Sequence, residues 1–122
     1  MFENAVREFG ERLGLSGFSL NNNGVASLSI DSIGLVSLEA IEQPDHSTSL
    51  LVSLGREIPP SDVSPVEKLL KKINWRNNPR LVFYVGVSGN NLVLSSYLSE
   101  RAVTAASIEN TLRFLSGEMP NV

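Results

Sequence analysis

Hydrophobic and polar residues alternate along the segment VASLSIDSIGLVSLEAI, which spans residues 25–41. On one parity lie the apolar residues Leu28, Ile30, Val36, Leu38 and Ala40. This period of two predicts a pair of β-strands with one buried face, joined by a short hairpin connection at DSIG, residues 31–34. On the other parity lie Val25, Ser27, Ser29, Leu35, Ser37, Glu39 and Ile41. This second face is small, mostly neutral and partly apolar, and the pattern leaves open whether it meets water or a partner.

The rest of the chain shows the same two kinds of pattern. The predicted elements, in chain order, are a helix over residues 2–13, strands over about 25–31, 35–42 and 48–55, a helix that begins after Ser64, strands over 80–87 and 92–98, and a helix over about 104–117. Apolar residues three or four apart predict the helices, and a capping box with Ser64, Pro65 and Glu67 marks the start of the middle one. The order α-β-β-β-α-β-β-α predicts a single α+β domain, residues 1–122, with a twisted antiparallel five-stranded sheet and three helices.

Composition and charge narrow the class of protein. The 10 Lys and Arg residues against 13 Asp and Glu residues give a net charge of −3, which argues against nucleic acid as the main partner. The absence of cysteine excludes disulfides and thiolate metal sites. The N-terminal segment carries charges throughout, and no apolar run approaches the ~20 residues of a membrane helix. We therefore expect a soluble, cytoplasmic protein with no signal peptide and no membrane insertion.

Residues that could carry catalysis are scarce. The single histidine, His46, lies in the turn segment PDHS, and with Asp45 alone it would leave a zinc site short of ligands. No Gly-x-Ser-x-Gly nucleophile elbow is present, and the glycines of VGVSGNN fit a hairpin turn better than a phosphate loop. The cluster Lys68, Lys71 and Lys72 fits a solvated helix face, with an acidic partner segment as the functional alternative. We expect no enzymatic activity, no metal and no cofactor.

Apolar surface is more abundant than three short helices can cover. The strands predicted over 80–87 and 92–98 are apolar on both parities, with Val82, Tyr84, Val93 and Tyr97 on the second one. A large apolar side chain left in water forgoes ~1.5–3 kcal/mol of burial, so a second copy of the chain is the simplest cover. Trp75, at the end of the middle helix, fits a core position and an interface position equally well.

An ordered set of motifs resembles a known family over nearly the whole chain. The motifs are LGL at 13–15, NNNGVASLSID at 21–31, LGREIP at 54–59, KLLKKIN at 68–74 and VFYVGVSGNNLVLSSYL at 82–98. Together they resemble the small acidic class I chaperones of bacterial type III secretion, the CesT/Tir-chaperone family. The resemblance implies a non-catalytic homodimer that binds the extended N-terminal chaperone-binding region of a secreted effector. Such a protein keeps the effector soluble and secretion-competent in the bacterial cytoplasm.

Two sets of site residues follow. The resemblance implies a dimer interface on the middle helix and the next strand, to which Trp75 is added as a candidate: Val66, Leu69, Leu70, Ile73, Trp75, Val82 and Tyr84. The neutral strand face leads us to a hypothesis for the effector-binding residues: Val25, Ser27, Leu35, Ser37, Ile41 and Leu51. Apolar patches and strand edges are the features that bury an extended segment.

Two other classes of function stay open. The first is a non-catalytic interaction domain of related α+β build, as in the YbjN-like proteins. The second is a small enzyme or ligand-binding domain with a pocket between sheet and helices. That second class predicts a cluster of buried polar residues, and the periodicity shows none.

Overall fold

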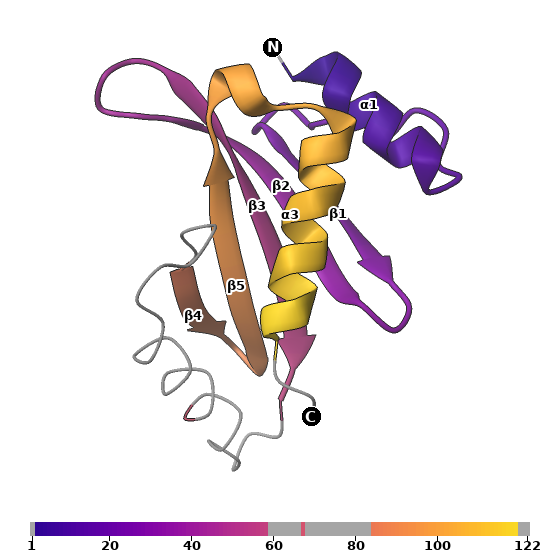
Figure 1. Cartoon of the computed structure of the whole chain (residues 1–122), viewed down its shortest axis with the longest axis vertical. Helices are drawn as coiled ribbons and strands as arrows, with labels where there is room; N and C mark the ends of the chain where they lie inside the picture. The colour runs from indigo at the N-terminus through magenta and orange to yellow at the C-terminus, as the bar shows by residue number, and fades with distance from the viewer. Residues whose placement is uncertain (1, 59–66, 68–83, 120–122) are drawn as a thin grey trace.

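Five strands form one antiparallel sheet in the order β1-β2-β3-β5-β4 (Figure 1). In the computed structural model, residues 2–58, 67 and 84–119 are described. The strands are β1 (Val25–Ile30), β2 (Gly34–Glu42), β3 (Thr48–Glu57), β4 (Tyr84–Ser88) and β5 (Asn91–Leu98). Each strand pairs with its neighbours in antiparallel register, so β1–β2–β3 forms a meander and β5 returns beside β3. The chain is therefore α+β, with its sheet built from strand runs that flank the segment between Glu57 and Tyr84.

The number of helices differs from the prediction. The described residues contain two α-helices, α1 (Glu3–Arg12) and α3 (Ala105–Glu118), and a short 3₁₀ helix, η1 (Glu100–Ala102). The prediction of three helices is therefore wrong for this part of the chain. The helix predicted to begin after Ser64 lies outside the described residues, apart from Glu67. The three-residue η1 has no buried residue, and so it leaves no apolar period in the sequence.

Both α-helices pack on one face of the sheet, and α3 runs along it (Figure 1). One row of core side chains crosses the sheet, because the register places Leu28 opposite Val36, Val36 opposite Leu54, Leu54 opposite Leu94 and Leu94 opposite Val85. The helices fill the space above with Phe9, Ile108 and Leu115, which are almost completely buried. This face holds the hydrophobic core, and the opposite face has none of the described helices on it.

Local chemistry explains the ends of these elements. Thr104 caps α3 in a reciprocal capping box, because its hydroxyl accepts from Ser107 N and Ser107 Oγ accepts from Thr104 N. At the start of β2, Gly34 has φ +133°, and a Cβ there would lie 2.4 Å from the carbonyl oxygen of Gly55. Only glycine allows this close approach of the β1–β2 hairpin to β3. None of the helices in the described part of the chain is long and apolar enough to cross a membrane.

Candidate functional site

The sheet face turned away from α1 and α3 is the candidate site, and we call it the outer face. Successive side chains of a strand point to opposite faces, so its members follow from the register. They are Val25, Ser27 and Ser29 on β1, Leu35, Ser37, Glu39 and Ile41 on β2, Ser49, Leu51, Ser53, Gly55 and Glu57 on β3, Asn91, Val93, Ser95 and Tyr97 on β5, and Tyr84, Gly86 and Ser88 on β4. The outer face thus spans all five strands.

A row of serines runs across the middle of the outer face. The register places Ser27 opposite Ser37, Ser37 opposite Ser53, Ser53 opposite Ser95 and Ser95 opposite Tyr84. The hydroxyls of Ser53 and Ser95 lie 2.8 Å apart and share a hydrogen bond. Because serine is small, the row forms a low floor, and the Ser53–Ser95 hydrogen bond does not depend on water when a partner covers it.

Larger side chains stand on both sides of the serine row. On one side, Val25, Glu39, Leu51 and Tyr97 are successive cross-strand partners. On the other side, Leu35 lies between Ser29 and Gly55, and its side chain is 46% exposed. The serine floor therefore has a bulkier row on one side and the exposed Leu35 on the other, and an extended segment can lie against it.

Two tyrosines close the outer face at the β4–β5 edge. The rings of Tyr84 and Tyr97 meet edge to face, with centroids 5.7 Å apart and an interplanar angle of 81°. They nevertheless remain 55% and 40% exposed, respectively. Exposed aromatic rings that hold each other in place are typical anchors of protein interfaces.

Charge is sparse on the outer face. Within the described strands, its ionisable groups apart from the tyrosine phenols are Glu39 in its interior and Glu57 at the exposed end of β3, and neither lysine nor arginine lies on it. The helix-covered side differs, because Arg12 Nη1 of α1 and Glu109 Oε2 of α3 form an ion pair of 3.0 Å. Away from the outer face, in the β2–β3 turn, hydrogen bonds from the Ser47 hydroxyl and backbone N–H lower the pKa of Asp45. The outer face is therefore nearly neutral and easily dehydrated.

The six residues predicted to bind an effector all lie on the outer face: Val25, Ser27, Leu35, Ser37, Ile41 and Leu51. They do not gather at one point, because Leu35 and Ile41 stand at opposite ends of β2, roughly 20 Å apart at ~3.3 Å per residue. They form a stripe over β1, β2 and β3 instead. Their role in binding stays a prediction.

Of the predicted dimer-interface residues, Tyr84 alone lies in the described part of the chain. It stands on the outer face against Tyr97, which lies opposite Leu51, one of the predicted effector-binding residues. The others, Val66, Leu69, Leu70, Ile73, Trp75 and Val82, lie outside the described residues.

Sequence reasoning did not assign the β5 part of the outer face to the site. Val93 and Tyr97 stand out in the sequence as apolar residues on the second parity, but parity alone does not tell which strand lies beside them. The register supplies that neighbour, since Gly55 lies opposite Val93 and Leu51 opposite Tyr97.

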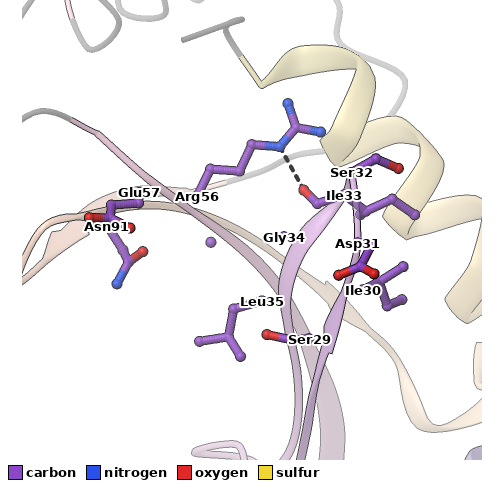
Figure 2. A pocket seen from close by; sticks show the side chains of 11 residues that line it. Ser29, Ile30, Asp31, Ser32, Ile33, Gly34, Leu35, Arg56, Glu57 and Asn91 are labelled. Atoms are coloured by element: carbon purple, nitrogen blue, oxygen red, sulfur yellow. Dashed lines mark hydrogen bonds between the residues drawn. The ribbon is translucent and has the colours of Figure 1, made fainter.

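Two of the hollows lie beside the β1–β2 turn, and the outer-face residues Ser29, Leu35 and Gly55 line part of the first. One, of about 590 Å³, surrounds the β1–β2 turn (Figure 2). There Arg56 Nε donates to the carbonyl oxygen of Ile33 over 2.6 Å, and Nη2 donates to Ser116 Oγ over 3.1 Å (Figure 2 shows the first). Through these two hydrogen bonds, the guanidinium links the β1–β2 hairpin to α3. The described residues contain no group of three or more His, Asp or Glu side chains placed to hold a metal ion.

The second hollow, of about 340 Å³, lies between α1, the β1–β2 turn and α3. Its lining is mainly apolar and includes Phe9, Leu13, Ile33 and Leu112, with Glu109 and Arg113 among its polar members. Leu13, which directly follows α1, is exposed at this hollow.

An α+β sheet with helices on one face and a neutral, partly apolar second face defines a protein-binding domain. The comparisons with known proteins agree: the model of the Tir chaperone protein (CesT) family matches residues 4–120, and the chain belongs to this family. The resemblance seen in the sequence motifs is thus confirmed. No curated protein sequence matches the chain.

Solved structures show the same fold. The Yersinia pestis type III secretion chaperone SycH, in complex with a stable fragment of YscM2, aligns with a TM-score of 0.66 and 20% identity over 98% of this chain and 100% of its own. The ExsC–ExsE complex aligns with a TM-score of 0.61 and 22% identity over 95% of this chain and 91% of the matched one. YbjN, a putative transcription regulator from E. coli, aligns with a TM-score of 0.54 and 21% identity over 93% of this chain and 82% of its own.

Proposed function

We propose that this protein is a type III secretion chaperone that binds the N-terminal chaperone-binding region of a secreted effector in the bacterial cytoplasm. The observation that carries the proposal is the match to the Tir chaperone protein family over residues 4–120. SycH, whose fold this chain shares, is itself a type III secretion chaperone in complex with a fragment of another protein. The chaperone acts by binding and not by catalysis, and it keeps the effector soluble and secretion-competent.

The outer face is the proposed docking surface for effector segments. An apolar effector side chain placed against Leu35 or Leu51 leaves water, which stabilises the complex by ~1.5–3 kcal/mol for each large side chain fully buried. The serine row between them lets the effector backbone approach closely. The near absence of charge keeps the desolvation cost low. The apolar hollow beside α1 offers a second contact for the same partner.

In this proposal, the functional unit of the protein is a homodimer of this single domain. Its interface comprises Val66, Leu69, Leu70, Ile73, Trp75, Val82 and Tyr84, of which the last is described. The contact between Tyr84 and Tyr97 supports this arrangement, because it makes the outer face of each protomer continuous with the proposed interface. An effector segment on the outer face would then reach the proposed interface at Tyr84.

The test is co-expression with the product of the neighbouring gene, followed by pull-down, for the wild type and two charge insertions. Leu35→Glu places a carboxylate on the outer face and is expected to lower effector capture at least about tenfold, which corresponds to ~1.4 kcal/mol. Val87→Glu is the matched control, because Val87 is 59% exposed but points to the helix side of the sheet. We expect this control to capture effector like the wild type.

Light scattering checks both variants for the dimer, at about twice 13.3 kDa. Undiminished capture by Leu35→Glu and by Leu51→Glu would contradict docking on the outer face. A monomer at micromolar concentration would contradict the dimer. A stand-alone interaction domain like YbjN is the second candidate, supported by the shared fold, and it predicts no captured neighbour at all.

A further inference from the structure

Glu39 is an isolated charge in the interior of the outer face. It lies on β2, between Val25 on β1 and Leu51 on β3, and its side chain is half-buried. The structure gives it no ion pair within the described residues, and the neighbouring outer-face side chains are apolar residues and serines. A partner that covers Leu51 and Val25 therefore also strips water from this carboxylate.

Burying a carboxylate without a partner is strongly unfavourable, whereas a cation placed against it restores the lost interaction. The described outer face supplies no cation of its own. The covering segment must therefore bring one, or leave Glu39 in water. We expect the covering segment to bring a cation, because Glu39 is half-buried and its neighbours on both sides are the apolar groups that a partner would cover.

Tyr97 gives the cation a second contact. It lies two strands from Glu39 in the same cross-strand row, with Leu51 between them. At ~4.8 Å between neighbouring strands, the two positions are roughly 10 Å apart, a span that the side chain of one arginine can occupy. Tyr97 remains 40% exposed although its ring contacts Tyr84. A guanidinium on an aromatic ring gains cation–π attraction, and its donors match a carboxylate in geometry.

We propose that the outer face selects a partner-protein segment with an arginine that lies over Leu51, between the Glu39 carboxylate and the Tyr97 ring. The inference rests on the proposed function, since it names the chemistry of the segment that docks there. The residues on either side of the arginine are apolar or small, to match Leu35, Val25 and the serine row. Glu39 thereby sets the register of the docked segment as well as its charge.

The test uses three fluorescein-labelled peptides as probes. They share an alternating Leu–Ser core with soluble Gly–Asn ends and differ only in the central residue, which is arginine, glutamine or glutamate. Fluorescence anisotropy at low salt is expected to show that the wild-type protein binds the arginine peptide at least about fivefold more tightly than the glutamine peptide, and the glutamate peptide most weakly. Glu39→Gln should remove the difference between the arginine and glutamine peptides.

Two further variants separate the contributions. Glu57→Gln removes an exposed carboxylate from the end of β3 and should keep the preference for arginine, which excludes a general effect of net charge. Tyr97→Leu should reduce the preference for arginine while the glutamine peptide still binds, because leucine keeps the apolar contact and loses the ring.

Several results would overturn the inference. Equal binding of the arginine and glutamine peptides to the wild type, no binding of the arginine peptide, or a preference that survives Glu39→Gln would each do so. If the wild type shows no preference for the arginine peptide and Leu35→Glu abolishes the binding of all peptides, the docking surface is supported and the arginine contact is wrong. If Leu35→Glu changes neither peptide binding nor effector capture, the docking surface itself is wrong. A shift of Glu39→Arg from dimer to monomer in light scattering would assign Glu39 to a contact with a second copy of the chain and overturn the inference.

Discussion

The two faces of the sheet come from the same five strands and have opposite characters. On the helix side, Val36, Leu38 and Val52 are completely buried. On the outer face, their neighbours along the same strands include Ser37 and Ser53, which are half-buried. The alternation of the strands is regular on both faces, so the difference lies in what each face packs against and not in the backbone.

This difference separates stability from binding. The helix side buries large apolar side chains against α1 and α3, and that burial drives folding. The outer face contributes little burial among the described residues, yet it keeps Leu35, Leu51 and Tyr97 where charged residues would be better hydrated. A face that neither packs in the fold nor repels a partner is suited to binding, in agreement with membership of a chaperone family.

The largest expected effect compares two leucines on the two faces. Leu38→Ala removes a completely buried side chain and should lower the free energy of unfolding by about 2–5 kcal/mol. Leu51→Ala, one strand away on the outer face, should lower it by about 1 kcal/mol or less and instead weaken effector capture. Denaturant unfolding with a constant m-value measures both. Equal losses of stability would remove the distinction between the faces.

A smaller effect tests the floor of the outer face. Ser53→Ala leaves the Ser95 hydroxyl without its 2.8 Å partner and should lower the free energy of unfolding by about 1 kcal/mol. The double variant Ser53→Ala with Ser95→Ala removes both hydroxyls and should recover most of that loss. The four proteins form a double-mutant cycle in the same unfolding assay. Additive losses would mean that the two serines do not act as a pair.

The smallest expected effect concerns the ion pair on the helix side. Glu109→Gln breaks the 3.0 Å contact with Arg12 between α3 and α1. Because both side chains are partly exposed, the loss should be about 0.2–1 kcal/mol and should shrink at high salt. Effector capture should not change if docking depends on the outer face alone. Because Glu109 also lines the apolar hollow beside α1, a clear loss of capture would support the second contact proposed there.

The sequence predicted the bounds of helices and strands best where a local pattern of apolar residues specifies a single element. The alternation over residues 25–41 predicted β1 and β2 to within about a residue, and the apolar spacing predicted α1 and α3 similarly well. It missed η1, whose three residues bury nothing and so carry no pattern. The helix predicted after Ser64 and most of the predicted dimer interface lie outside the described residues.

For the candidate site, the sequence identified the right face but only part of its extent. It singled out Val25, Leu35 and Ile41 because they lie within one hairpin, where the partners are close in the chain. Val93 and Tyr97 belong to the same face through β3, where their partners Gly55 and Leu51 lie 38 and 46 positions away in the chain. Long-range register depends on how the whole core packs, and a local pattern does not encode it.

By itself, the sequence determined which residues form strands, which side of each strand is apolar, and the family to which the chain belongs. These properties follow from side-chain parity and motif order, both of which are local. The tertiary structure alone decided that the serines form one row, that Tyr84 meets Tyr97, and that Glu39 stands isolated among apolar neighbours. The physical reason is that the side chains of one sheet face come together only when distant strands pair in a defined register. Burial of the hydrophobic core on the opposite face sets that register.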